Sequence, residues 1–300
     1  MPAPARGMAA ACVAMLLSAC ASVQNGPTPT ASVPVAAAPT SPPAGMQYLY
    51  GSGEAAALST QAYRALTSYA AAQVKARPTD SVVLAEGTAL DMPAFTPCGY
   101  KPFAAVFDVD ETVMLNTGFE YYDARSGKGY DAAAWDAWEK TGEGAVEAVP
   151  GAALALRELR AMGVTVIFNT NRSTANADAT VRAIRAAGLG DAVHGQTLFL
   201  NGDDAMGSAK DGRRATIAAK YCVIAMGGDQ LGDFSDLFNR DKPAPATRRA
   251  ATMQPLIARL WGNGWFVLPN PVYGSGLKGG FDDIFPLDKR WALPASKEAN

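Results

Sequence analysis

Residues 103–112 have the sequence FAAVFDVDET, a short hydrophobic segment that ends abruptly in two aspartates, Asp108 and Asp110. Branched and aromatic residues in such a segment are typical of a buried parallel strand, and open α/β sheets bind ligands at the carboxyl ends of their strands. Side chains two residues apart on an extended chain point to the same side, so both carboxylates can face one reacting group. Taken alone, the pattern also fits a strand that finishes in a solvated acidic turn.

Later segments favour a functional interpretation of this pair of acids. Residues 164–168, VTVIF, and residues 222–226, CVIAM, predict two further buried strands, and a helix-like stretch begins between them. Polar and charged side chains follow these strands or begin that stretch: Thr170, Asn171, Arg172, Lys210, Asp229 and Asp233. Because the carboxyl ends of parallel strands meet at one edge of a sheet, these residues are expected to lie near Asp108.

In this order the segments resemble the four motifs of the haloacid dehalogenase (HAD) superfamily. Asp108 and Asp110 look like the nucleophile motif, Thr170 like the phosphate-binding hydroxyl, Lys210 like the charge-neutralising lysine, and Asp229 with Asp233 like the metal motif. More narrowly, residues 48–281 resemble the class C bacterial acid phosphatases of the outer-membrane lipoprotein e type. The blocks that carry this narrower resemblance are residues 130–138, 149–152, 170–172 and 268–274.

The resemblance implies an α/β fold with a Rossmann-like HAD core, in which a mainly parallel sheet is flanked by helices and carries a small helical cap at about residues 118–147. The chain itself predicts helices at residues 53–74, 150–162, 174–187 and 213–219, and a late strand at residues 265–268. In the superfamily, the strands that carry the first and third buried segments are neighbours. A disulfide between Cys98 and Cys222 is therefore a hypothesis for an exported protein.

The expected chemistry follows from the needs of a phosphomonoester dianion. Such a substrate repels an anionic nucleophile, so catalysis requires a cation, hydrogen-bond donors around phosphorus and a proton for the leaving alcohol. We expect Asp108 to attack phosphorus and form an aspartyl-phosphate, and Asp110 to act as general acid and then as general base. Thr170 and Lys210 are expected to hold the phosphoryl oxygens. For Lys210 alone, a surface lysine on a polar helix is the alternative interpretation.

A magnesium ion would offset the cost of placing like charges together. Mg²⁺ prefers six oxygen ligands and keeps several waters. The expected ligands are the carboxylates of Asp108 and Asp229 and the backbone carbonyl of Asp110, with Asp233 orienting a bound water.

The substrate interpretation rests on aromatic residues in the predicted cap and near the end of the chain. In the family, aromatic residues that match Trp135 and Tyr273 enclose the base or nicotinamide ring of a nucleoside monophosphate, although such rings can also fill a hydrophobic core. Asn171 and Arg172 are expected to contact the substrate, but Arg172 could instead pair with a nearby acid. Small-molecule phosphomonoesters are thus expected, with a bias towards nucleoside 5′-monophosphates or aryl phosphates.

Composition excludes several other phosphatase classes. His194 is the only histidine, which excludes histidine phosphatases and zinc or dinuclear phosphatases that need several. No cysteine is followed by arginine at the spacing of a tyrosine-phosphatase loop, and no glycine-rich nucleotide loop is present. The formal net charge is −2 without a basic run, so a nucleic-acid polymer is not an expected partner.

The first residues predict export and lipid anchoring. Residues 1–19 contain a basic residue, a short hydrophobic stretch and small residues, as a bacterial lipoprotein signal peptide does, and Cys20 follows as the expected lipidated residue. The alternative is an ordinary signal peptide with a chance cysteine. Residues 20–45 predict a disordered Ala/Pro linker, and residues 46–300 the phosphatase domain. The expected location is the bacterial cell envelope, with the lipid on Cys20 in the outer membrane.

Two other functions are compatible with parts of the pattern. A phosphotransferase would use the same intermediate and pass the phosphoryl group to another alcohol. A non-catalytic surface lipoprotein could capture haem or a nucleotide, although the complete set of acids argues against a dead enzyme.

Overall fold

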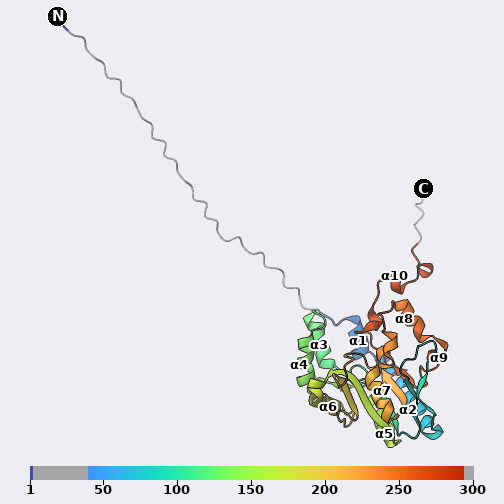
Figure 1. The fold of residues 1–300 in the computed structure, drawn as a ribbon. Coiled ribbons are helices and arrows are strands. Elements are labelled where there is room, and N and C mark those ends of the chain that lie inside the picture. Colours follow the sequence, from blue (N-terminus) through green and yellow to red (C-terminus); the bar gives the residue numbers. More distant parts are fainter. Residues whose placement is uncertain (3–39, 294–300) are drawn as a thin grey trace. The chain divides into compact units, whose positions relative to one another are not determined.

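The computed structural model describes residues 1–2 and 40–293 of the 300-residue chain. All described helices and strands lie in one unit of the chain, Ala38–Asn300 (Figure 1). Residues 3–19 of the predicted signal peptide, Cys20 and most of the predicted linker fall outside the described residues. Within the described ranges, none of the helices combines the length and hydrophobicity that crossing a membrane requires.

A five-stranded sheet forms the centre of this unit. Its strand order is β7-β6-β3-β8-β9, and every neighbouring pair is parallel. The strands are β3 (Phe103–Phe107), β6 (Thr165–Ser173), β7 (Leu198–Asn201), β8 (Cys222–Gly228) and β9 (Trp265–Val267). In register, Phe107 is paired with Phe168 on one side and Gly227 on the other. The three buried strands predicted from sequence are therefore adjacent, with residues 103–107 in the middle, and the predicted fold class is confirmed.

Helices cover both faces of the sheet because alternate residues of each strand are buried on opposite sides. Ala105 and Phe107 pack in one hydrophobic cluster and Ala104 and Val106 in the other. The first cluster includes residues of α2 (Gly53–Ala76), α5 (Ala152–Ala161) and α6 (Ala177–Ala186), and the second includes residues of α7 (Asp211–Lys220). Burial on both faces explains why the central strands are continuously hydrophobic in sequence.

A small helical insertion lies between the short antiparallel strands β4 (Met114–Leu115) and β5 (Glu147–Ala148). It contains α3 (Thr117–Ser126) and α4 (Ala132–Thr141), which match the expected cap (Figure 1). The rings of Phe119 and Trp135 pack edge to face, with centroids 4.8 Å apart, and this contact joins the two helices. The indole of Trp138 donates to the Asn116 side chain at 2.9 Å, which fixes α4 to the residue that joins β4 to α3.

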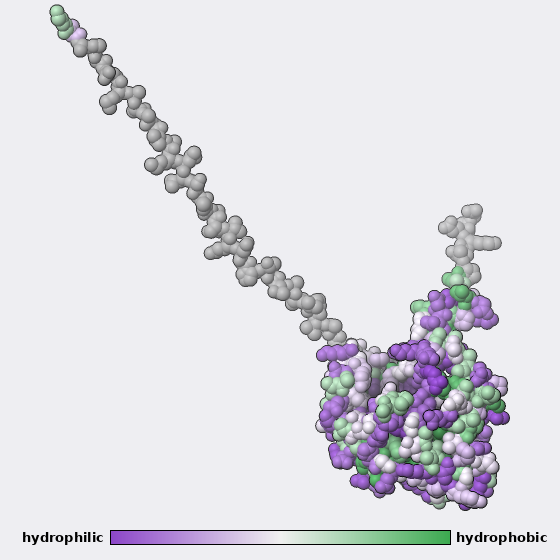
Figure 2. Space-filling view, in the orientation of Figure 1, coloured by the Kyte–Doolittle hydropathy of each residue, from purple (hydrophilic) through white to green (hydrophobic). Residues whose placement is uncertain are grey.

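Shorter elements complete the described structure. A second antiparallel pair comprises β1 (Asp80–Leu84) and β2 (Phe95–Pro97). The other helices are α1 (Ala44–Gly51), α8 (Pro245–Thr252), α9 (Pro255–Ala258) and α10 (Phe281–Ile284). The 3₁₀ turns are η1 (Gly142–Ala145), η2 (Thr174–Asn176), η3 (Leu231–Asp233), η4 (Asp236–Phe238), η5 (Ser275–Leu277) and η6 (Leu287–Lys289). Figure 2 shows one face of the molecule, on which hydrophilic and hydrophobic residues are interspersed.

One strand end was predicted wrongly. The sequence indicates a strand that stops at Phe168, whereas β6 continues to Ser173 and includes the polar residues of the second motif. The pairing with β3 does end at Phe168. Beyond that residue β6 remains paired with β7, with an irregularity between Asn169 and Ser173. The polar residues thus lie on a strand that projects past its central neighbour.

The hypothesised disulfide is present between Cys98 and Cys222, at the end of the sheet opposite to Asp108. It links residues 124 positions apart, so reduction should lower the free energy of unfolding by about 2–4 kcal/mol, chiefly through a less constrained unfolded chain. Chemical unfolding with and without reductant measures this loss. A Cys98→Ala/Cys222→Ala variant should not respond to reductant. Two free thiols in denatured, unreduced protein would contradict the prediction.

Candidate functional site

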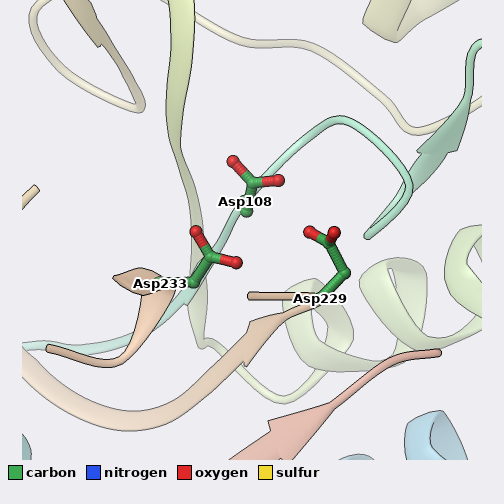
Figure 3. A group of neighbouring side chains, drawn as sticks. All are labelled: Asp108, Asp229 and Asp233. Atoms are coloured by element: carbon green, nitrogen blue, oxygen red, sulfur yellow. The ribbon is translucent and has the colours of Figure 1, made fainter. Parts of the chain in front are cut away.

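Three carboxylates converge at the carboxyl ends of β3 and β8 (Figure 3). Asp108 directly follows β3, Asp229 directly follows β8, and Asp233 ends η3. One oxygen from each side chain lies within 4.8 Å of the others. The structure therefore brings together Asp108 and Asp229, the predicted metal ligands, and Asp233, which is predicted to orient a bound water.

Backbone contacts of the two strands hold these acids in place. The Asp108 amide donates to the Gly227 carbonyl at 3.0 Å, which continues the pairing of β3 with β8. The Gln230 amide donates to Asp233 Oδ2 at 2.8 Å. A Cβ atom at Gly228 would lie 2.3 Å from the Cβ of Asp233, so only glycine allows this close approach.

Lys210 lies at the start of α7, with its ammonium between two of the acids. It is 4% exposed and forms ion pairs with Asp108 and, at 2.7 Å, with Asp233. Burial lowers the pKa of Lys210, but the two carboxylates outweigh this effect and raise it above its usual value, so the side chain stays charged. The alternative of a surface lysine is wrong.

One buried ammonium leaves the three acids short of positive charge. Burial raises the pKa of Asp108 despite the opposing effect of Lys210, and burial together with Asp233 raises the pKa of Asp229 to about 7. Among the described residues, the backbone carbonyl of Asp110 accepts no backbone hydrogen bond. Carboxylate and carbonyl oxygens suit a hard divalent cation, so the donor set fits a metal ion and can hold one.

Asp110 is bound by groups that orient its carboxyl group. Its Oδ1 accepts from Arg172 Nη2 at 2.7 Å, from Arg172 Nε at 2.9 Å and from Asn116 Nδ2 at 2.9 Å. Arg172 is 1% exposed and does not line the cavity described below. Of the two roles that the sequence leaves open for Arg172, the structure shows the pairing with an acid.

The other residues of the second motif are divided between two positions. Thr170 is fully buried, and its hydroxyl lies 3.4 Å from Asp110 Oδ2. Asn171 lines the cavity and donates to the Ser208 carbonyl at 3.1 Å. Only Asn171 of these two therefore faces open space in the structure, while Thr170 lies behind Asp110.

A cavity of about 680 Å³ opens above the acids. Asp108, Lys210 and Asp229 line its inner part. Aromatic side chains of the cap and of the segment after β9 line the remainder: Phe119, Tyr130, Trp135 and Tyr273. The two aromatic residues predicted to contact substrate thus border the same space as the acids.

Two buried acids anchor these aromatic side chains. Trp135 Nε1 donates to Glu139 at 2.7 Å, and Glu139 also accepts from the Ser173 amide at 3.1 Å. The Tyr273 hydroxyl donates to Glu111, whose pKa burial and Asp110 raise to about 8. The sequence interpretation missed both acids. The i,i+4 spacing of Trp135 and Glu139 on a helix was the available signal for the first.

Two buried arginines of α7 were also missed. Arg213 donates to the Thr170 carbonyl and, at 2.7 Å, to Asn171 Oδ1. Arg214 donates to the backbone carbonyls of Gly232 and Asp233, each at 2.9 Å. These arginines fix the chain segments of the second and fourth motifs. Their position three and four residues after Lys210, one helical turn along α7, was the available signal.

A further acid of the cap, Glu120, gives a stability prediction. Its residue exposure is 6%, and burial, with Asp123 and Asp110, raises the pKa of Glu120 to about 7. Between about pH 4 and pH 7 the folded protein therefore keeps a proton that the unfolded chain has released, and ionisation of this group destabilises the fold as pH rises.

Glu120→Gln should consequently raise the free energy of unfolding by about 2 kcal/mol at about pH 8 and leave it unchanged at about pH 4. Thermal unfolding at the two pH values measures the effect. Glu86→Gln, which replaces an exposed loop acid, is the matched control. An equal gain at both pH values, or none, would contradict the assignment.

Comparison with known proteins gives a consistent result. The family model described as HAD superfamily, subfamily IIIB (acid phosphatase), matches residues 15–276. Two solved structures of the class C acid phosphatase from Bacillus anthracis, one of them with tungstate bound, are each 25% identical in sequence. Their TM-scores are 0.61 and 0.62, and each match covers 77% of this chain and 84% of the other. The family match spans the sheet, the cap and every acid of the site.

Proposed function

Because the chain belongs to subfamily IIIB of the HAD superfamily and is a phosphoric monoester hydrolase of the acid phosphatase type, we propose that it acts through an aspartyl-phosphate on Asp108. The observation that carries this proposal is the placement of Asp108. Its carboxyl group lies at the base of the cavity, between Lys210 and Asp229. In this position a carboxylate can reach phosphorus while neighbouring groups screen its charge.

The first step would form a bond between an Asp108 oxygen and phosphorus and break the bond from phosphorus to the leaving oxygen. Asp108 Oδ2 accepts from the Thr112 hydroxyl at 3.3 Å, and the other oxygen is paired with Lys210. Lys210 would also stabilise the negative charge of the phosphoryl oxygens, and Asn171 and Thr170 would donate hydrogen bonds to these oxygens. Of these two donors, Thr170 must exchange its present partner, Asp110, to reach the substrate.

Asp110 would supply the proton for the leaving alcohol. Its carboxyl group lines the cavity, and Arg172 and Asn116 fix its orientation through Oδ1. Oδ2 is the oxygen left to exchange a proton with the leaving alcohol and later with the attacking water. Arg172 is thus proposed to position the acid rather than to bind phosphate.

Mg²⁺ is the metal that we propose for the acid cluster, with Asp108, Asp229 and the Asp110 carbonyl as ligands and Asp233 as the residue that orients a bound water. When bound, it would neutralise charge on the nucleophile and on the phosphoryl group. The raised pKa of Asp229 and the shortage of nearby positive charge support this assignment.

Nucleoside 5′-monophosphates and aryl phosphates are the proposed substrates. Trp135 and Tyr273 line the cavity that contains Asp108, and each ring is held by a buried acid. Stacking of a planar base on an aromatic side chain contributes about 1–3 kcal/mol. One solved structure of the class C acid phosphatase from Bacillus anthracis holds tungstate, a tetrahedral oxyanion like phosphate, which supports an oxyanion site in this chain.

We propose the cell envelope as the location, with a signal peptide at residues 1–19, a lipid on Cys20 and a linker to residue 45. The outer membrane is the proposed destination. Membrane fractionation of cells that express the full chain tests this assignment. Cys20→Ser should release the activity from the membrane fraction, and an unchanged distribution would contradict a lipid anchor.

Phosphate release from p-nitrophenyl phosphate and from a panel of nucleoside monophosphates, with and without Mg²⁺, tests the proposed activity. We expect turnover with Mg²⁺ and a preference for nucleoside 5′-monophosphates over simple alkyl phosphates. Mass spectrometry of quenched turnover should find phosphate on Asp108. Tight ligand binding without turnover would favour a capture protein instead. Transfer to an added alcohol in preference to water would favour a phosphotransferase.

A further inference from the structure

Glu120 lies in the wall between two cavities. It projects from α3, and it and Met46 line both the large cavity above Asp108 and a smaller cavity of about 310 Å³ on the other side. The residue is more than nine-tenths buried. Its carboxyl group therefore borders the two cavities and has little contact with bulk solvent.

This carboxyl group has no partner among the described residues, since no hydrogen bond or ion pair reaches it. Three other acids that line the large cavity do have a basic partner. Asp108 is paired with Lys210, Asp110 with Arg172, and Asp236 lies 3.4 Å from Arg214. A buried carboxylate without a donor or cation is costly, and the raised pKa of Glu120 reflects that cost. The missing partner is a group that the cavity can admit.

The position of Glu120 assigns it to the leaving-group side of the cavity. Asp110, the proposed proton donor to the leaving alcohol, is close enough to contribute to the raised pKa of Glu120. The adjacent ring of Phe119 packs against Trp135, and both rings line the cavity. A leaving group bound against these rings lies beside Glu120.

The charge of the cavity favours a cation at this position. Among the described residues that line it, every charged side chain except Lys210 is an acid, and Asp123, one turn after Glu120, also lines it without an ion pair. Carboxylates and aromatic faces together form the usual environment of a bound organic cation. A neutral alcohol can offer Glu120 a hydrogen bond but no compensating charge.

We propose that Glu120 is a specificity-determining residue that selects phosphomonoesters whose leaving alcohol carries a positive charge, such as a quaternary ammonium group. This inference rests on the proposed function and adds a substrate class to it. Phosphate binding and the chemistry at Asp108 are common to all phosphomonoesters, so the effect concerns the choice of leaving group alone.

Two esters of matched shape test the proposal. Phosphocholine and 3,3-dimethylbutyl phosphate differ in one atom, a charged nitrogen in place of a neutral carbon. For each ester, kcat/KM is measured with Mg²⁺, and its inhibition constant against p-nitrophenyl phosphate is measured as well. The wild type should favour the charged ester by about 10-fold, the effect of one partly solvated ion pair with aromatic contacts. Glu120→Gln should lose most of that ratio.

Glu143→Gln is the control variant, because it removes the same charge from the cap at a half-exposed residue that pairs with Arg182 and does not line the cavity. It should keep the wild-type ratio. An equal ratio in wild type and Glu120→Gln, or a wild-type preference for the neutral ester, would overturn the proposal. Absence of p-nitrophenyl phosphate hydrolysis would instead refute the proposed function, and this inference with it.

Discussion

Asp108→Asn should lower kcat for p-nitrophenyl phosphate by about 10⁴-fold or more, with little change in KM. An amide cannot attack phosphorus at a useful rate, so the substitution removes the covalent step and leaves the binding groups in place. Lys210 keeps its ion pair with Asp233 in this variant. The fold is expected to persist, because the substitution is isosteric and removes a buried charge that burial and three neighbouring acids already disfavour.

Asp241→Asn provides the matched control for this variant. Asp241 lies in an exposed loop with a φ of 58°, a backbone conformation that asparagine adopts readily. The Asp241→Asn variant should hydrolyse p-nitrophenyl phosphate at the wild-type rate. Thermal unfolding of both variants confirms that each is folded. A rate for Asp108→Asn within about 10-fold of the wild type would show that Asp108 is not the nucleophile.

Sequence reasoning succeeded where one pattern had one physical explanation. The hydrophobic residues 103–107 are flanked in register by residues 165–168 and 222–227, and the alternation of buried faces accounts for each segment. Asp108 and Asp229 then follow at the same edge, since each ends a parallel strand. These positions depend on local periodicity and on chain order, which a single sequence contains.

The groups that orient the site could not be found in the same way. Arg172 has a side chain that can reach either a phosphate or an acid, and only the folded chain shows that Asp110 Oδ1 lies 2.7 Å from its guanidinium. Glu111 sits in a turn with a φ of 54°, so its side chain leaves the path that an extended strand predicts and meets Tyr273 from a distant segment. Such contacts depend on tertiary packing rather than on spacing.

Removal of the metal should abolish phosphate release, and Asp229→Asn should reproduce much of that loss at ordinary Mg²⁺ concentrations. Asp229 is buried beside Asp233, and its Oδ2 accepts from Asn270 at 2.7 Å and from Gln230 at 3.0 Å. The substituted amide can keep these contacts through its oxygen. It cannot supply the negative charge, so the Mg²⁺ concentration for half-maximal activity should rise by about 100-fold.

The same substitution should have opposite effects on stability with and without the ion. In the chelated protein, the charge of Asp229 is opposed by burial and by Asp233, so Asp229→Asn should unfold at a higher temperature than the wild type at about pH 8. With Mg²⁺ in excess, binding stabilises the wild type more strongly and the order should reverse. Thermal unfolding under the two conditions measures both differences. An unchanged order, together with full activity in chelator, would contradict a metal at this cluster.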